Sequence, residues 1–171
     1  MHSPTPEQLE IPHAASVVLR CDGMYLDEQR WDDWLDLYSE QCEFWLPTWK
    51  TFENLTDNPR RELSHIYLGN RAAIEERVSR LRSRRSAASW PMPRTAHMLS
   101  NTLNVGASGA RLHLRSSWSC SIFLPRDGQS HVYFGRVDHE LELSGGRYTI
   151  AAKKVIILND HVPASLDFYF V

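Results

Sequence analysis

The chain has 171 residues, a formal net charge of −2, and a composition of 42% apolar and 23% charged residues. That length suffices for one domain with a sizeable core, and the composition is typical of a globular protein. The near-zero charge argues against nucleic acid or an anionic membrane as a partner. There is no apolar run of the roughly 20 residues that span a bilayer. MHSPTPEQLE is not a signal peptide, so we expect a cytoplasmic location.

The N-terminal part of the chain is predicted to be helical after an arm at residues 1–11. Pro12 suits the first turn of a helix but not its interior. Apolar residues at helical spacing then predict one buried face, made of Ala14, Val17, Val18, Cys21 and Tyr25.

The stretch RWDDWLDLYSEQCEFWLP predicts a second, short helix followed by a strand. From Trp31, residues Trp34, Leu35 and Tyr38 fall on one helical face, and Asp27 is a plausible N-cap. Asp32, Asp33 and Asp36 fall largely on the other face. These aspartates allow two interpretations: a carboxylate pair for acid–base chemistry, or a solvated helix face. We favour the second, because neighbouring aspartates diverge on a helix.

The middle of the chain predicts a strand, a loop, a strand and a helix. CEFWLP is an apolar strand that ends at Pro47, residues 50–61 form a polar loop, and SHIYLG is a second strand. Asn70 then caps a helix with an apolar face of Ile74, Val78 and Leu81. The segment 83–93 is expected to be irregular. We expect Trp34 and Trp45 to be buried in the core.

From Arg94 onward the apolar period changes to two, which predicts long strands. The clearest alternation is at residues 111–122, and 147–159 predicts a strand buried on both faces. Between 131 and 143 the apolar phase shifts at Val132 and Phe134, so we expect a bulge or strong bend there. Residues 166–170 predict a terminal strand or tail. Helices followed by strands indicate an α+β fold, a curved antiparallel sheet packed on N-terminal helices, in a single domain at 1–171.

No motif in the sequence identifies a catalytic centre. Nucleophile elbows, phosphate loops and compact metal-ligand pairs are absent, and three widely spaced cysteines make a poor disulfide framework. A facial triad for iron could be assembled from His65, His97 and Asp138, but eight histidines allow many such triples. We therefore assign no catalytic, cofactor-binding or metal-binding residue to this chain.

Two features are candidates for a subunit interface. The arginine run RVSRLRSRR is either a solvated helix end favoured by the helix dipole or a surface for an acidic partner. Tryptophans beside loops are core residues by default, but they are also frequent anchors at interfaces. The candidate interface residues are Trp45, Trp49, Arg82, Arg84 and Arg85.

Several segments together resemble a known family. They are LDEQRWDDWLDLYSEQCEFWLPTW, LTDNPRRELSHIYLGNR, IEERVSRLRSRRSA, PRTAHMLSN and KKVIILND. They are similar to the small (beta) subunits of aromatic-ring-hydroxylating dioxygenases, which are Rieske non-haem iron oxygenases. The resemblance covers the chain from about residue 15 onward. WLPTW followed by LTDNP looks most like the benzoate and anthranilate branch.

The resemblance implies a nuclear-transport-factor-2-like cone and a mainly structural role. It implies that a large (alpha) subunit holds the Rieske two-iron two-sulfur cluster and the mononuclear iron. It also implies three alpha plus three beta subunits, with NADH electrons relayed by a reductase or ferredoxin. The reaction would be cis-dihydroxylation of an aromatic carboxylate. Two alternatives stay open: a free-standing dehydratase or isomerase of the same fold using His97 or an aspartate as base, and a non-catalytic ligand-binding module.

Overall fold

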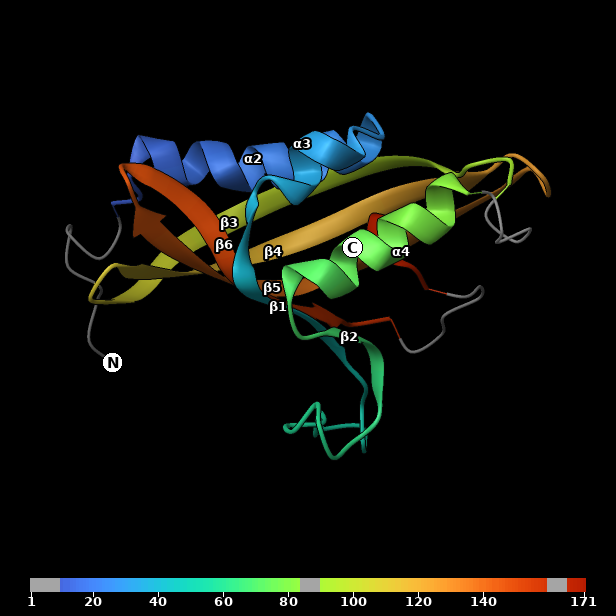
Figure 1. Ribbon diagram of the computed structural model, residues 1–171. Helices are drawn as coiled ribbons and strands as arrows, with labels where there is room; N and C mark the ends of the chain where they lie inside the picture. Colours follow the sequence, from blue (N-terminus) through green and yellow to red (C-terminus); the bar gives the residue numbers. More distant parts are fainter. Residues whose placement is uncertain (1–9, 84–89, 160–165) are drawn as a thin grey trace.

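A computed structural model describes residues 10–83, 90–159 and 166–171, and its central feature is a six-stranded sheet. The strand order is β2-β1-β6-β5-β4-β3 (Figure 1). The strands are β1 (Tyr38–Pro47), β2 (Ser64–Leu68), β3 (Arg94–Ser108), β4 (Arg111–Leu124), β5 (Gln129–Ser144) and β6 (Arg147–Ile157). Most of the predicted arm, residues 1–9, lies outside the described residues.

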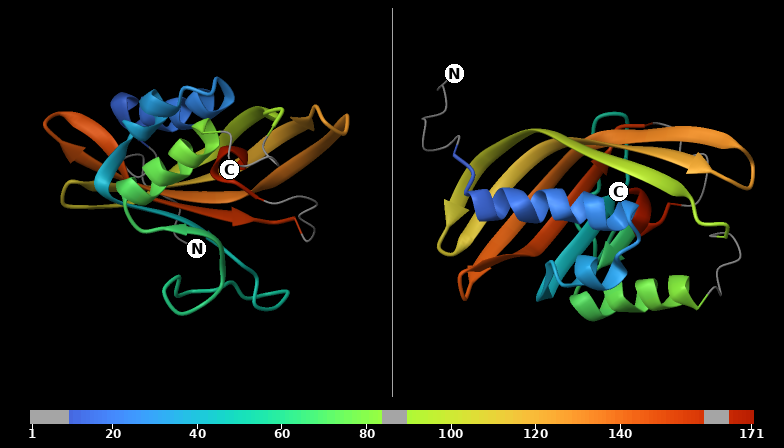
Figure 2. Two further views of the ribbon diagram at one scale, coloured as in Figure 1. Left: turned by 45° about the vertical axis from the view of Figure 1, so that its right-hand side comes forward. Right: turned by 90° about the horizontal axis from the view of Figure 1, so that it is seen from above.

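The sheet is mixed, whereas the sequence predicted an antiparallel one. Neighbouring strands are antiparallel except β1 and β6, which are parallel. The chain between these two strands contains every other strand and α4, which gives ample length for a parallel return. The α+β class is confirmed, and the strong curvature of the sheet is visible in Figure 2.

Three helices lie on one face of the sheet: α2 (His13–Asp27), α3 (Trp31–Leu35) and α4 (Arg71–Arg82) (Figures 1 and 2). α4 begins as predicted, because the Asn70 side chain accepts a hydrogen bond from the Ala73 backbone N–H at 2.9 Å. Its apolar face of Ile74, Val78 and Leu81 is buried. Within the described residues, no helix is both long and apolar enough to cross a membrane.

Aromatic rings join the helices to the sheet. Trp34 of α3 is fully buried, as predicted, and its ring stacks on Phe168 at 5.1 Å between centroids. Phe168 begins the 3₁₀ helix η2 (Phe168–Phe170), whose three residues are buried beneath the helices. Tyr38 and Phe44 of β1 complete the cluster around Trp34. The segment predicted as a terminal strand or tail is therefore a buried helical turn.

Three details of the predicted helices are wrong. Tyr38 is the first residue of β1 rather than part of the short helix, and Asp27 ends α2 rather than capping α3. The buried face of α2 is also displaced by about one residue, to Ala15, Val18, Leu19, Asp22 and Leu26. The apolar pattern missed this face because one of its buried positions holds a carboxylate.

The bulge expected within residues 131–143 is found in the pairing of β5 with β6, whose register shifts between Glu140 and Leu141, and not at Val132 and Phe134 in the pairing of β4 with β5. The register of β4 with β5 is unbroken from Arg111↔Glu142 to Leu124↔Gln129. Val132 and Phe134 are about half exposed on the outer face, while Tyr133, Gly135, Val137 and His139 point inward. The apparent phase shift arose because Gly135 and His139 occupy inward positions that carry no apolar side chain.

Candidate functional site

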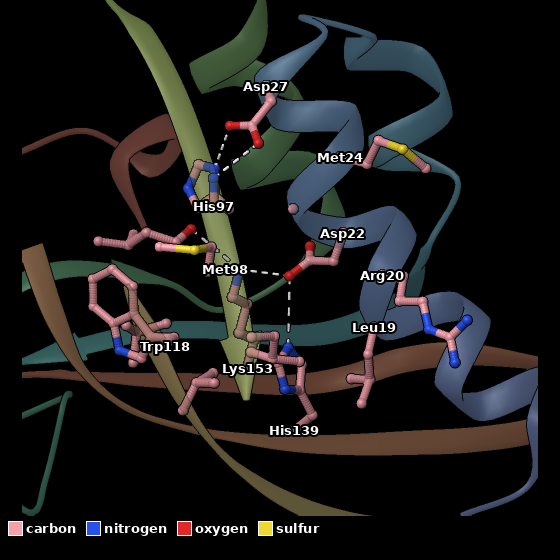
Figure 3. A pocket seen from close by; sticks show the side chains of 15 residues that line it. Leu19, Arg20, Asp22, Met24, Asp27, His97, Met98, Trp118, His139 and Lys153 are labelled. Atoms are coloured by element: carbon pink, nitrogen blue, oxygen red, sulfur yellow. Dashed lines mark hydrogen bonds and ion pairs between the residues drawn. The ribbon is translucent and has the colours of Figure 1, made fainter. Parts of the chain in front are cut away.

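A cavity of about 390 Å³ lies between α2 and the sheet. Figure 3 shows Asp22 and Asp27 of α2 facing His97, His139 and Lys153, which come from three strands. Much of the remaining wall is apolar and includes Leu19, Met98, Trp118, Val137 and Val155. A mostly apolar cavity with a few converging polar groups is the usual form of a small-molecule site.

A buried ion pair forms the floor of this cavity. The Lys153 Nζ atom lies 2.6 Å from Asp22 Oδ2 and donates a second hydrogen bond to the Val171 main-chain oxygen at 3.2 Å. Asp22 Oδ1 accepts hydrogen bonds from Trp34 Nε1 at 2.8 Å and Tyr38 Oη at 3.0 Å. Burial opposes the charge on Asp22, but the nearby Lys153 and His139 hold its pKa well below the usual value. A buried carboxylate with three donors is well satisfied, and removing any one partner would leave a buried polar or charged group unpaired.

His139 stands beside the ion pair without a hydrogen bond. Its Nε2 atom is 3.6 Å from Asp22 Oδ2, and neither ring nitrogen has a hydrogen-bond partner among the described residues. Burial lowers the pKa of His139 below its ordinary value, although Asp22 acts in the opposite direction. The neutral imidazole is therefore the form that the fold favours.

Asp27 and His97 form a second pair at the other end of the cavity. Asp27 Oδ1 is 2.6 Å from His97 Nδ1, and Asp27 Oδ2 accepts a hydrogen bond from the His97 backbone N–H at 2.8 Å. Partial burial would raise the pKa of Asp27, but these hydrogen bonds lower it overall. The His97 side chain is only 10% exposed, and its Nε2 atom is buried with no partner among the described residues. One carboxylate thus fixes the imidazole and leaves its far nitrogen unused.

The part of the chain that the structure describes contains no evident metal-binding site. No group of three or more His, Cys, Asp or Glu side chains there is arranged to hold a metal ion. The hypothetical triad is not formed, since His65 and His97 lie on strands at opposite edges of the sheet. Asp138 instead pairs with Arg115 at 2.6 Å.

Two of the three cysteines, Cys42 and Cys120, are not activated nucleophiles. Cys21, Cys42 and Cys120 are all free thiols. Burial raises the pKa of Cys42 to about 11 and that of Cys120 to about 12. Both thiols therefore stay protonated near neutral pH and act as small core residues.

The aspartates of the acidic helix lie on the surface in ion pairs. Asp32 Oδ1 is 2.7 Å from Arg82 Nη2, and Asp33 Oδ2 is 2.8 Å from Arg30 Nε. Both side chains are more than half exposed and point to different partners. This arrangement is that of a solvated helix face rather than of converging catalytic acids.

The candidate interface tryptophans differ in burial. Trp45 is 6% exposed, as predicted for a core residue, and its Nε1 donates to Ser64 Oγ at 2.9 Å. Trp49 is 36% exposed, and its Nε1 donates to the Ile157 main-chain oxygen at 2.8 Å. Arg82 is the one candidate arginine among the described residues, since Arg84 and Arg85 lie outside them.

The cavity residues were not singled out from the sequence, apart from His97 as a base in the free-standing-enzyme alternative. Their spacing along the helix and the strands could nevertheless have identified them. Asp22 lies four residues from both Val18 and Leu26, which are buried on α2. Lys153 and His139 likewise share the inward phase of their strands. A polar residue in phase with buried apolar neighbours is the pattern that identifies such a site.

The fold, helices packed on a curved sheet with a cavity between them, defines a cone-shaped α+β class of protein. Comparison with known proteins identifies the family. Residues 22–164 match the family model of the ring hydroxylating beta subunit, and the chain belongs to that family. Such a subunit is part of a ring-hydroxylating dioxygenase, an enzyme in which it associates with an alpha oxygenase subunit.

The chain is similar to subunits of the benzoate-like branch of this family. The chain is 36% identical over 156 residues to the benzoate 1,2-dioxygenase subunit beta of Acinetobacter baylyi, covering 91% of each chain. It is 32% identical over 167 residues to the anthranilate 1,2-dioxygenase small subunit of the same organism, covering 95% of this chain and 99% of that one. The crystal structure of a benzoate 1,2-dioxygenase beta subunit from Burkholderia mallei matches with a TM-score of 0.76 at 29% identity, covering 95% and 99%.

The nuclear-transport-factor-2-like fold implied by the resemblance is confirmed. More distant structures share it, including a hexachlorocyclohexane dehydrochlorinase at a TM-score of 0.63 and 12% identity. That match covers 91% of this chain and 90% of the other, and at such low identity it is informative about the fold alone.

Proposed function

We propose that this chain is the small, mainly structural subunit of a terminal oxygenase that cis-dihydroxylates an aromatic carboxylate of the benzoate or anthranilate type. The observation behind this proposal is the identity of 32–36% to benzoate and anthranilate dioxygenase subunits over nearly the whole chain. The partner alpha subunit would hold the Rieske cluster and the mononuclear iron. NADH electrons would arrive through a reductase or ferredoxin, in a cytoplasmic assembly of three alpha and three beta subunits.

In this proposal the chain itself contributes no catalytic residue. Its buried charges are engaged in the Asp22–Lys153 network, and its acidic helix is paired on the surface through Asp32 and Asp33. Both arrangements are those of a scaffold, since each charge already has a partner within the chain. The chemistry of dioxygen would then take place in the alpha subunit.

We further propose that the β1–β2 loop, residues 48–63, docks on the alpha subunit. This loop projects away from the sheet and the helices (Figure 1). It exposes large apolar side chains, with Phe52 at 99% and Leu63 at 83%. Such side chains at a protruding tip are typical of a protein-binding surface.

The loop is held in shape before any partner binds. The Trp49 indole anchors it to β6 through the Ile157 oxygen, and Lys50 pairs with Glu62 across it. Trp45 is packed at its base under the Lys154 ammonium, 4.3 Å from the ring centroid. A loop that is ordered in advance loses less conformational entropy on docking. Arg82, the last residue of α4, belongs to the same proposal as a basic contribution, together with Arg84 and Arg85, which lie outside the described residues.

The test is reconstitution of the oxygenase. The chain is co-expressed with the alpha subunit from the same source, and consumption of benzoate and anthranilate is measured with NADH and the reductase. We expect a stable complex that hydroxylates one or both acids, and little turnover by either subunit alone. Full turnover by the alpha subunit without this chain would contradict the proposal.

One observation favours a second candidate, a free-standing dehydratase or isomerase, or a binding module. The polar residues do converge on a cavity, with the Asp27–His97 pair at its wall. An oriented imidazole with a free nitrogen is a suitable general base. This alternative requires activity or binding by the isolated chain without an iron-containing partner.

A further inference from the structure

We propose that the cavity beneath α2 is a binding site for a small uncharged molecule that has an apolar body and a hydroxyl group, such as a phenol, and that His97 Nε2 accepts the hydroxyl hydrogen. This site lies in the beta chain itself and is separate from the ring chemistry of the proposed function. It can therefore be tested whether or not the assembly forms. The argument rests on the unused nitrogen, the size and lining of the cavity, and its charge balance.

The unused nitrogen of His97 is a costly feature unless something binds it. A buried polar atom without a hydrogen bond destabilises a protein, because it has lost its bonds to water and gained none in return. His97 Nε2 has no hydrogen-bond partner in the part of the chain that the structure describes, and its side chain is nine-tenths buried and lines the cavity. A ligand hydroxyl within the cavity would satisfy it.

Asp27 determines the chemical character of that nitrogen. The Asp27 carboxylate is 2.6 Å from His97 Nδ1, so the ring hydrogen lies on Nδ1. In a neutral imidazole held in this tautomer, Nε2 is an acceptor. It therefore selects a ligand that donates a hydrogen bond, such as a hydroxyl, over one that only accepts.

The backbone of α2 holds His97 in this position. Gly23 lies against it, and a Cβ atom at Gly23 would come within 2.9 Å of the His97 Cβ. The absence of a side chain at Gly23 thus allows β3 to approach the helix closely. The second contact, from Asp27 to the His97 backbone N–H, fixes the main chain at the same point.

The size and lining of the cavity suit a compact apolar molecule. Its volume of about 390 Å³ falls in the range of small-molecule sites. A cavity of about 150 Å³ lined by apolar residues already admits benzene, so a substituted ring fits here with room to spare. Trp118, Met98 and Leu19 provide surfaces against which a ring can pack (Figure 3).

The charge balance of the cavity argues for an uncharged ligand. Its charged lining consists of two acids, Asp22 and Asp27, and two bases, Arg20 and Lys153. Lys153 is already engaged by Asp22 and Val171. Arg20 is exposed and donates to Ser16 Oγ at 3.3 Å, so it is a cation of the surface and not of the cavity interior. A carboxylate buried in the cavity would therefore find no free buried cation among these residues, and burying an unpaired charge is strongly unfavourable.

The experiment is a titration of the purified full-length chain, and of its complex with the alpha subunit, with 4-fluorophenol. Binding is followed by fluorine NMR and by the nitrogen NMR of ¹⁵N-histidine. Fluorobenzene serves as the probe without a hydroxyl, and benzoate as the charged probe. We expect saturable binding of 4-fluorophenol at one site per chain, together with a shift of the His97 Nε2 resonance that fluorobenzene does not cause.

The variant H97F removes the acceptor while keeping a ring of similar size. We expect it to weaken 4-fluorophenol binding about fivefold to tenfold, the effect of one hydrogen bond, and to leave fluorobenzene binding unchanged. The matched control is H65Q, which changes an exposed histidine on β2, at the opposite edge of the sheet from β3. It should bind as the wild type does.

Three results would overturn the proposal. They are no saturable binding of 4-fluorophenol by the wild-type chain up to the solubility limit, tighter binding of benzoate than of 4-fluorophenol, and an unchanged His97 Nε2 resonance on saturation. If H97F does not fold, the nitrogen NMR of the wild type decides alone. Binding by the free chain together with failed reconstitution would count against the proposed function and not against this site.

Discussion

Asp22 of α2 and Lys153 of β6 are 131 residues apart in the chain, yet their charged atoms lie 2.6 Å apart in the interior. The pair joins the first described helix to the last strand, and both side chains are about 5% exposed. Trp34 and Tyr38 bind the same carboxylate, so helix α3 and strand β1 meet at this point as well. One carboxylate thus ties together elements from both ends of the chain.

The first prediction concerns this ion pair. D22N or K153M alone should lower the free energy of unfolding by about 3 to 5 kcal/mol, because each leaves a buried charge without its partner. The double variant should cost clearly less than the sum of the single ones. Urea unfolding of all four proteins measures the coupling. Additive effects would mean that the two charges do not interact in the folded chain.

The second prediction concerns the pH dependence of stability. Burial lowers the folded-state pKa of His139, so its contribution is fully present above the unfolded value of 6.5 and is lost as the pH falls toward the lower folded value. Asp22 and Lys153 lie beside this imidazole, and the charge of Asp138 acts on it from the next position along β5. Asp22 has a lowered pKa of its own, and its contribution is lost only below its unfolded value of 3.8. Stability should therefore fall in two separate acid ranges.

The variant H139N removes the contribution of His139 to the loss of stability in the upper of these two pH ranges. Its unfolding free energy should change less than that of the wild type between pH 7 and the folded pKa of His139. H65N is the comparison, because partial burial also lowers the pKa of His65 on β2. It should remove the His65 share of the same pH range and leave the His139 share in place. The same slope in H139N as in the wild type would assign the acid sensitivity to other groups.

The third prediction concerns Gly135 in β5. A Cβ atom there would lie 1.9 Å from the main-chain oxygen of Ile156 in β6, so a side chain would force the two strands apart. G135A should destabilise the chain by about 3 kcal/mol or more. The matched control is G145A in the β5–β6 turn, which has open space but a φ of +58°. That variant should cost only about 1 to 2 kcal/mol, and equal effects would contradict the steric argument.

The sequence correctly predicted the elements in which buried positions hold apolar residues and exposed positions hold polar ones. Alternation in β4, the Asn70 cap and the buried Trp34 were all recovered, because in each case an apolar or capping residue occupies the position that its chemistry favours. The predictions failed where a buried position holds a residue that is not apolar. Asp22 broke the apolar face of α2, and Gly135 with His139 disguised the inward phase of β5.

The candidate site could not be predicted in the same way, because it depends on long-range contacts. His97 and Asp27 are 70 residues apart in the chain, and only the crossing of α2 over β3 brings them together. The parallel pairing of β1 with β6 is equally invisible to local pattern. Local pattern describes each strand by itself and leaves the order of strands undetermined.

The fourth prediction concerns the proposed docking loop. F52S should weaken assembly with the alpha subunit at least tenfold while leaving the stability of the free chain unchanged, since Phe52 is 99% exposed. The triple variant with alanine at Arg82, Arg84 and Arg85 should weaken assembly in a salt-dependent way. Analytical ultracentrifugation of mixtures measures both. Separately, D32N with D33N should leave turnover by the assembled enzyme unchanged, since both side chains lie in surface ion pairs.

The central claim is that this chain works as the subunit of an iron-containing oxygenase. Native mass spectrometry of the chain purified from its source cells, with iron analysis of the same sample, tests it most directly. The account predicts a stable complex with a larger, iron-containing chain, at equal numbers of the two subunits. A lone, iron-free oligomer of this chain would contradict it.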